Sequence, residues 1–328
     1  MEIRKYDVDH LSSFTDEWNL HNGCSEWWYC TGFLETEDKK KFSYQFTLIN
    51  TFIAEGMTVK VLMLALTDLQ TGEHHYSQTP AMSGEGIILE QNKLSFHNKA
   101  LVDVVQNGMH IKLNHKAFSL DLELENGKGA FWHCDNGKLY MGTVDEKETT
   151  YYYSYTNMPT KGTLSLIQED GAVKTCKVTG KTWFDKQGGT YETKRESHWE
   201  WFSLRFFDNE EVMLFTFPVT DYIDGTYITS GRKSSRLNNY TVTRRKIIEV
   251  DGMKWSSSWD VYLPGIKEEH YTITPYFEGN INFTYFEELC SIKNKAGEEV
   301  GMCFVELLPL VLNETGVKND NLTQVVEY

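Results

Sequence analysis

The chain of 328 residues lacks three features: a long apolar run, an excess of basic charge and a closely spaced cysteine pair. No stretch approaches the ~18 consecutive apolar residues of a membrane helix, so we expect no stable membrane insertion. The first residues, MEIRKYDVDHLSSF, also lack an apolar core. We therefore predict no signal peptide and expect a cytoplasmic location.

Basic charge is scarce, because 47 Asp and Glu residues outnumber 32 Lys and Arg residues and give a formal net charge of -15. Nucleic acids and anionic membranes bind basic surfaces. Neither is therefore expected as the main partner of this chain. The sequence leaves the oligomeric state open.

Cysteine spacing gives no sign of a metal or redox site. The six cysteines contain no CxxC pair: they are Cys24, Cys30, Cys134, Cys176, Cys290 and Cys303. In a reducing compartment such residues are mostly small buried hydrophobes. Only His74-His75 and residues 133–135 (HCD) resemble ligand fragments, whereas a metal site needs close ligand pairs on both sides. No P-loop, dinucleotide fingerprint or G-x-S-x-G elbow is present, so we predict neither metal nor cofactor.

The strongest pattern that is present is an alternation of apolar and polar residues, which indicates β-strands. It is clear in AFSLDLELE (117–125) and in KFSYQFTLI (41–49). In the second run the polar side is uncharged, which favours a barrel wall over a plain surface strand. Asn107-Gly108, Asn126-Gly127 and Asn136-Gly137 are tight-turn dipeptides. Helical periodicity is scarce, so we predict an all-β chain of sandwiches or barrels.

The polar segment KQGGTYETKRESH (186–198) contains a Gly pair and separates two Trp-rich stretches. We place a domain boundary there. The predicted domains are residues 1–192 and residues 193–328.

Aromatic residues make up 14% of the chain. Core filling explains most of them, but Trp and Tyr also line ligand cavities. Segments in which an acid lies among aromatic residues are therefore the candidates for a functional site.

The segment CSEWWYCTGFL (24–34) places one carboxylate directly before the run WWY. If the segment is a strand, Glu26 shares a face with Trp28 and Cys30. One interpretation is a half-exposed strand whose Glu26 faces water. The other is an acid held in an apolar cavity, where burial raises its pKa and keeps it protonated near neutral pH.

Two further segments combine aromatic and polar residues. In KTWFDKQGG, an extended chain places Trp183, Asp185 and Gln187 on one face. In HWEWFSLRFFD, Trp199 and Trp201 share a face. Asp185 also has the plainer interpretation of a residue that stabilises a turn.

The segment YFEELCSIKNKAGEEVGMCFVELLP predicts a hairpin that turns at Ala296-Gly297. A two-residue turn places Glu287 opposite Glu306, whereas a three-residue turn with a Gly bulge puts Glu288 and Glu306 on one face. Either register makes two carboxyl groups neighbours, which raises one pKa in a poorly hydrated place. Alternatively, both groups face solvent or pair with Lys and Arg.

Several segments, in order, resemble the carotenoid 1,2-hydratase/AttH-like family. They are EWWYCTGFL, ALTDLQTGEHHYSQ, YYYSYTNMPTKGTLSL, VTGKTWFDKQGG, WFSLRFFDNEEVMLFTF, DGTYITSG and YFEELC…GEEVGMCFVELL. Related lipocalin-like proteins include kievitone hydratase and fungal decalin-forming Diels–Alderases. The resemblance implies two lipocalin-like β-barrel or β-sandwich domains with a ligand cavity at or near their contact.

The resemblance and the chemistry together give the candidate site residues. The candidate catalytic residues are Glu26, Asp185, Glu288 and Glu306, and the candidate substrate-binding residues are Trp28, Tyr153, Trp183, Gln187, Trp201, Trp259 and Phe286. Family members usually carry His after the Asp of this motif and an aromatic residue after the Gln. Here these positions are Lys186 and Gly188, which indicates a shift in substrate or reaction.

The expected function is that of a cofactor-independent hydratase or cyclase acting on an apolar isoprenoid or polyketide-like molecule. A carboxylic acid would protonate a C=C bond, and aromatic faces would stabilise the carbocation. The alternatives are a pericyclase that folds a polyene substrate and a non-catalytic carrier of a hydrophobic ligand. Family members differ in reaction, so the resemblance does not choose among these.

Overall fold

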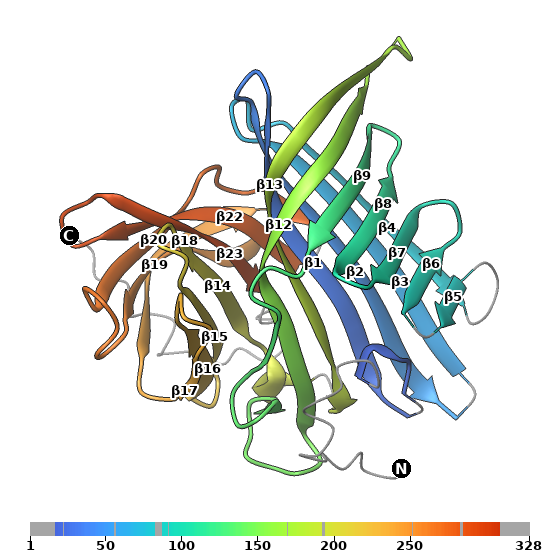
Figure 1. The fold of residues 1–328 in the computed structure, drawn as a ribbon. Helices are drawn as coiled ribbons and strands as arrows, with labels where there is room; N and C mark the ends of the chain where they lie inside the picture. The colour runs from blue at the N-terminus through green and yellow to red at the C-terminus, as the bar shows by residue number, and fades with distance from the viewer. Residues whose placement is uncertain are drawn as a thin grey trace. The chain divides into compact units, whose positions relative to one another are not determined.

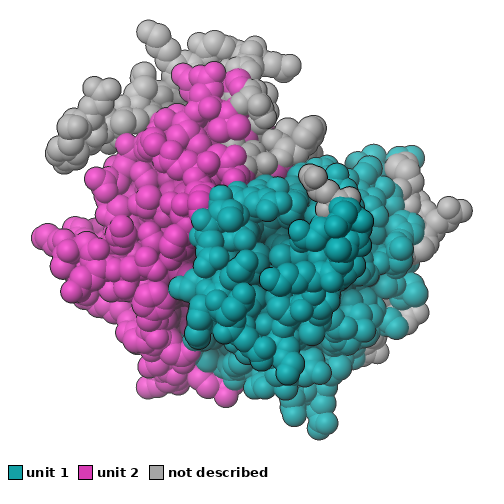
Figure 2. Space-filling view, turned by 90° about the horizontal axis from the view of Figure 1, so that it is seen from above, with its two compact units in different colours: residues 1–132, 150–190 teal, residues 133–149, 191–328 magenta. Residues whose placement is uncertain are grey.

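Antiparallel strands with short connections form nearly all of the regular structure, as the alternation of the sequence predicted. The computed structural model describes residues 17–308, apart from residues 22, 56, 83–86, 91, 169, 192–193, 251 and 283–284. The described residues fall into two units, coloured separately in Figure 2. Unit 1 comes from residues 1–132 and 150–190, and unit 2 from residues 133–149 and 191–328.

Unit 1 contains one strongly curled antiparallel sheet, a half-barrel (Figure 1). Its strands are β1 (Ser25–Thr36), β2 (Lys41–Ala54), β3 (Met57–Asp68), β4 (His74–Met82), β5 (Ile87–Glu90), β6 (Lys93–Phe96), β7 (Ala100–Val105), β8 (Gly108–Asn114), β9 (Phe118–Glu125), β10 (Ala130–Trp132), β12 (Thr149–Ile167) and β13 (Val173–Thr190). The spatial order is β4-β3-β2-β1-β13-β12-β9-β8-β7-β6-β5. Two meanders are therefore joined through the hairpin β12–β13.

Strands β12 and β13 are 19 and 18 residues long, and Figure 1 shows this hairpin in green and yellow-green, extending past the neighbouring strands. Strand β13 pairs with β1 without a register shift from Ser25 to Thr36. This pairing brings residues that are about 160 positions apart in the sequence side by side. It therefore determines what surrounds the EWW motif.

The sheet of unit 1 has two sides, which we call the core face and the reverse face. The core face carries the apolar cluster, which includes Trp28 and Cys30 on β1, Phe46 on β2 and Leu64 on β3. On β2 the intervening side chains Ser43, Gln45 and Thr47 point to the reverse face and are buried as well. The prediction that this polar side avoids bulk water is confirmed.

Unit 2 also consists of one curled antiparallel sheet. The strands of this sheet are β14 (Glu200–Phe206), β15 (Glu211–Phe217), β16 (Tyr222–Ile228), β17 (Ser234–Leu237), β18 (Thr241–Val250), β19 (Met253–Tyr262), β20 (His270–Pro275), β21 (Ile281–Asn282), β22 (Tyr285–Asn294) and β23 (Glu299–Leu307). Unit 2 also contains β11 (Lys138–Tyr140), which is not part of this sheet, and the 3-10 helix η2 (Arg195–Ser197). The order is β17-β16-β15-β14-β23-β22-β20-β19-β18, with β21 beside β22. Its core face carries a second apolar cluster that includes Phe202, Trp259, Phe286 and Val305.

Two of the predicted turns have the backbone that their residues favour. Asn136 and Gly137 both have positive φ, 52° and 92°, and connect the bridged residues Asp135 and Lys138. The β22–β23 turn closes from Asn294 to Glu298, with Gly297 at φ 83°. Among the described helices, none is long and apolar enough to span a membrane.

Candidate functional site

Glu26 lies fully buried on the core face of unit 1, where β13 supplies a cation. Lys186 is the strand partner of Trp28, and its Nζ forms an ion pair with Glu26 Oε2. The backbone N–H of His21 donates to Glu26 Oε1 at 2.6 Å, and His21 Nδ1 lies 3.1 Å from Oε2. The carboxyl group therefore has partners at both oxygens.

These partners reverse the predicted charge state of Glu26. Burial acts to raise the pKa of this carboxyl, but the Lys186 ammonium and the His21 hydrogen bond outweigh burial and hold the pKa below its ordinary value. The prediction of a protonated Glu26 in an indole wall is wrong, because the carboxyl is ionised and paired. The interpretation of a strand residue facing water is also wrong, since Glu26 is 0% exposed.

Aromatic rings enclose this ion pair. Lys186 Nζ lies 4.3 Å from the centroid of the Trp28 ring, within cation–π range. The indole N–H of Trp28 donates to the Trp18 carbonyl oxygen at 3.0 Å, and the Trp18 ring stacks on Phe184. Opposite Glu26 stands Gly188, where a Cβ would lie 2.3 Å from the Glu26 Cβ. The absence of a side chain at Gly188 therefore makes room for Glu26.

Two polar residues that the sequence did not single out extend this cluster. Asn50 is the β2 partner of Glu26, and Lys60 is the β3 partner of Asn50, so all three share the core face. Asn50 is 1% exposed, and its Oδ1 has no hydrogen-bond partner among the described residues. The alternation Phe42, Tyr44, Phe46, Leu48 continues to Asn50, which is the signal that could have found it.

The reverse face of unit 1 carries the second predicted motif. Trp183, Asp185 and Gln187 alternate along β13 and are all buried, so the prediction that they share a face is confirmed. Asp185 Oδ1 accepts hydrogen bonds from the hydroxyl of Ser154 and from the Trp183 indole N–H, the latter at 2.5 Å. Gln187 Nε2 donates to Thr150 Oγ1 at 2.8 Å.

A second amide lies on this reverse face. Gln45 is 1% exposed and is separated from Trp183 only by Thr31 in the cross-strand row. Its Nε2 donates to Thr47 Oγ1, whereas its Oε1 has no hydrogen-bond partner among the described residues. The reverse face therefore combines a buried carboxyl, neutral donors and an available amide oxygen.

Glu26 and Asp185 do not face the same space. Glu26 pairs with Gly188 and Asp185 pairs with Tyr29, three residues along each strand, so their side chains point to opposite sides of the sheet. Tyr153 also departs from the Asp185 side, because it alternates with Ser154 and packs edge-on against Trp132 and Tyr155. Within unit 1 the candidate residues are therefore divided between the two faces of the sheet.

In unit 2 the hairpin β22–β23 places Glu287 opposite Glu306. The turn has three residues with Gly297 at the left-handed position, and a register shift between Ile292 and Lys293 restores the pairing expected of a two-residue turn. Glu306 lies on the reverse face, where the Trp199 indole N–H donates to its Oε1 at 2.7 Å. The alternative that pairs Glu288 with Glu306 on one face is wrong.

Glu288 instead points to the core face of unit 2, as the strand partner of Val305. Its Oε1 accepts the backbone N–H groups of Gly279 at 2.7 Å and Asn280 at 2.9 Å. Burial raises the pKa of this carboxyl to about 8, although the two N–H groups lower it. Glu288 is therefore the buried acid that keeps its proton near neutral pH.

The aromatic candidates of unit 2 divide in the same way. Trp259 and Phe286 belong to the core-face cluster and pack with ring centroids 6.2 Å apart. Trp201 is the strand partner of Glu306, so it lies on the reverse face. The prediction did not anticipate Trp255, which stacks on Phe286 at 5.9 Å.

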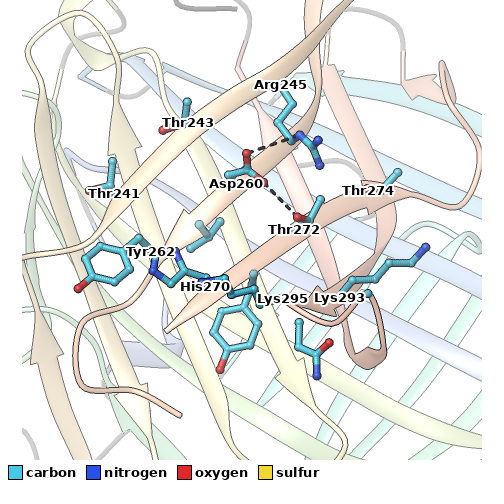
Figure 3. A pocket seen from close by; sticks show the side chains of 14 residues that line it. Thr241, Thr243, Arg245, Asp260, Tyr262, His270, Thr272, Thr274, Lys293 and Lys295 are labelled. Atoms are coloured by element: carbon cyan, nitrogen blue, oxygen red, sulfur yellow. Dashed lines mark hydrogen bonds and ion pairs between the residues drawn. The ribbon is translucent and has the colours of Figure 1, made fainter. Parts of the chain in front are cut away.

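One open groove in unit 2 contains none of the predicted site residues. It measures about 760 Å³ and lies across β18, β19, β20 and β22 (Figure 3). Asp260 links Arg245 and Thr272 there, and Lys293 and Lys295 lie at its rim. Such a polar, cationic lining does not suit an apolar ligand. Within the described part of the chain, no three His, Cys, Asp or Glu residues are grouped to hold a metal ion.

Comparison with known proteins identifies the family of this chain. The AttH-like family matches residues 6–309. The chain belongs to the AttH-like family. Its fold is similar to that of a Nitrosomonas europaea protein assigned as an AttH, with a TM-score of 0.77 at 18% identity over 94% of this chain and 98% of that one.

A second similar structure is that of kievitone hydratase from Nectria haematococca. It has a TM-score of 0.67 at 16% identity, over 86% of this chain and 88% of that one. At such identities the likeness shows a shared fold. None of the curated proteins compared with this chain matches it.

Proposed function

We propose that this AttH-like protein is a cofactor-independent hydratase or cyclase for an apolar isoprenoid or polyketide-like molecule, with Asp185 as the acid. The observation that carries the proposal is the buried Asp185 carboxyl, whose Oδ1 accepts from Ser154 and from the Trp183 indole. The similarity to kievitone hydratase supports the reaction class.

The charge state of Glu26 supports this choice of acid. Addition of a proton to an unactivated C=C bond needs a carboxyl in its neutral form. The paired Glu26 carboxyl is ionised by Lys186 and His21, so it has no proton to donate. In unit 1 this leaves Asp185 as the candidate acid.

The surroundings of Asp185 suit the loss of its proton. The Ser154 hydroxyl and the Trp183 indole N–H donate to Asp185 Oδ1 and stabilise the carboxylate that forms when the proton leaves. The proton adds to one alkene carbon, and the positive charge develops on the more substituted carbon. The adjacent Trp183 ring stabilises that charge by roughly 0.5–2 kcal/mol if the cation lies over its face.

Hydration and cyclisation differ in the next step. In hydration, water attacks the cation and the Asp185 carboxylate takes back one proton, so the net change is addition of water. The available Oε1 of Gln45 is an acceptor that would orient this water. In cyclisation, a second C=C of the same substrate attacks the cation, and loss of a proton gives an isomer of unchanged mass.

The second candidate function is non-catalytic binding of the same kind of molecule, or a pericyclic cyclisation without an acid. Both need the buried surface but not the Asp185 proton. The observation that favours them is Lys186, which replaces the His usual after this Asp in the family and is held by Glu26. A missing proton relay suits folding or carrying of a substrate.

The test is turnover of farnesol, an isoprenoid alcohol, in oxygen-18 water. Hydration gives a product that contains the label, cyclisation gives an unlabelled isomer, and a carrier returns bound farnesol unchanged. We expect Asp185→Asn to lower turnover on the order of 100-fold or more. Native mass spectrometry of the purified protein identifies any hydrophobic molecule that copurifies, which then replaces farnesol as the probe.

The matched control is Asp121→Asn, which makes the same change on the exposed side of β9. Unchanged turnover in Asp185→Asn contradicts the acid role. Loss in Glu26→Gln with full activity in Asp185→Asn would move the reaction to the core face. Absence of both binding and turnover with farnesol and the copurified molecule would contradict the substrate class.

A further inference from the structure

Three buried polar groups on the core face of unit 2 have unused hydrogen-bonding capacity. Among the residues that the structure describes, Trp255 Nε1, Trp259 Nε1 and Glu288 Oε2 have no hydrogen-bond partner. Their side chains are 2%, 0% and 3% exposed. Buried polar atoms almost always have a partner, so three such atoms in one cluster indicate an occupant that the protein chain itself does not supply.

Both indole rings pack on one aromatic ring. Phe286 stacks on Trp255 with a centroid distance of 5.9 Å and meets the edge of Trp259 at 6.2 Å. Glu288 follows Phe286 by two residues on β22, so its side chain rises from the same face. Strands β19 and β22 therefore carry the two indole rings that pack on Phe286 and, on the same face as Phe286, the carboxyl of Glu288.

The backbone determines which oxygen of Glu288 remains available. Oε1 accepts the N–H groups of Gly279 and Asn280, which fixes the carboxyl plane and leaves Oε2 for a ligand. Because the pKa of this carboxyl is raised to about 8, it carries a proton at neutral pH. The proton belongs on Oε2, since Oε1 already accepts two donors. All three available groups are then hydrogen-bond donors.

We propose that the core face of unit 2 binds a small apolar molecule with a carbonyl oxygen, such as a ketone or an enone. The oxygen accepts from the Trp255, Trp259 and Glu288 donors, and the hydrocarbon part packs on Phe286. A hydrocarbon would leave the donors unsatisfied, and an alcohol would bring another donor that needs an acceptor. This site belongs to unit 2 alone and does not depend on the role of Asp185.

The test compares 1-tetralone with tetralin, which has the same ring system without the carbonyl, by equilibrium dialysis against the full-length protein. We expect 1-tetralone to bind at least about tenfold more tightly. Trp255→Phe and Trp259→Phe should each lose several-fold in affinity for 1-tetralone and leave tetralin binding unchanged. Trp132→Phe, in unit 1, is the matched control and should retain the preference.

A pH series separates the carboxyl from the indoles. The charged or titratable neighbours of Glu288 are Glu278 and, on the same strand, Cys290. Glu278 forms an ion pair with Lys246. The affinity for 1-tetralone should fall as pH rises past about 8, because Glu288 loses its proton and becomes negative. Glu288→Gln keeps an N–H donor and removes the charge, so its affinity should not vary over this range.

Three results would overturn the proposal. The first is equal affinity for 1-tetralone and tetralin, or no binding of either. The second is a carbonyl preference that survives both Trp→Phe changes. The third is a crystal structure grown with 1-tetralone in which only ordered water accepts from the three donors.

Discussion

Glu26 and Glu288 are both buried glutamates on the core face of a curled sheet, yet the pKa shifts of their carboxyls are opposite in direction. Burial raises the pKa of each, but Lys186 and His21 reverse the effect at Glu26. At Glu288 two backbone N–H groups are present without a cation among its partners, so the pKa remains raised, at about 8. The comparison teaches that burial alone does not set the charge of a carboxyl, because the residue on the neighbouring strand decides it.

The largest expected effect on the difference between Glu26 and Glu288 comes from removing the cation beside Glu26. Lys186→Met leaves a buried carboxylate with its His21 contacts only, and we expect a loss of about 3–5 kcal/mol in the free energy of unfolding. The pKa of Glu26 should rise as well, as at Glu288. Urea unfolding followed by Trp fluorescence measures the loss.

The double variant Glu26→Gln/Lys186→Met is the control for this change. It removes both charges, so it should be more stable than Lys186→Met alone. A single variant that loses less than about 1 kcal/mol would show that the pair contributes little.

The pH dependence of stability tests the other glutamate. Between the ordinary pKa of 4.5 and about 8, native Glu288 holds a proton that the unfolded chain releases. Rising pH therefore favours unfolding through this window, and the contribution lost is on the order of 5 kcal/mol. Glu288→Gln should remove this part of the slope in urea unfolding at several pH values. Parallel curves for the two proteins would contradict the raised pKa.

A smaller effect comes from filling the space opposite Glu26. In Gly188→Ala the new Cβ would lie 2.3 Å from the Glu26 Cβ, so the strands must move apart. We expect a loss of about 1–3 kcal/mol in the free energy of unfolding. Gly231→Ala is the matched control, because its nearest neighbour is Thr229 Oγ1 at 3.8 Å. Equal stability of the two variants would show that β1 and β13 adjust without strain.

Local periodicity predicted which side chains share a face. Alternation within one strand predicted that Trp183 shares a face with Asp185, and Glu26 with Trp28. The structure confirms both pairs. The Asn136-Gly137 turn follows from the tolerance of both residues for positive φ. These features depend on a few neighbouring residues, which is why the sequence alone is enough for them.

The pairing of distant strands could not be read from one sequence. Nothing in the EWW segment shows that β13 lies beside it, so neither the ion pair with Lys186 nor the charge of Glu26 was accessible. The β22–β23 hairpin was uncertain by one residue for a similar reason. Its turn residues permit two registers, and the shift after Ile292 selects the one that places Glu287 beside Glu306.

Strand β13 carries consecutive members of one sequence motif to opposite sides of a single sheet. Asp185 and Lys186 are neighbours in the chain, yet one contacts Ser154 and the other Glu26. The motif is therefore two interleaved motifs, each free to change in evolution without the other. A relative that differs only at the position of Lys186 has altered the contacts on one face of the sheet and left those on the other face unchanged.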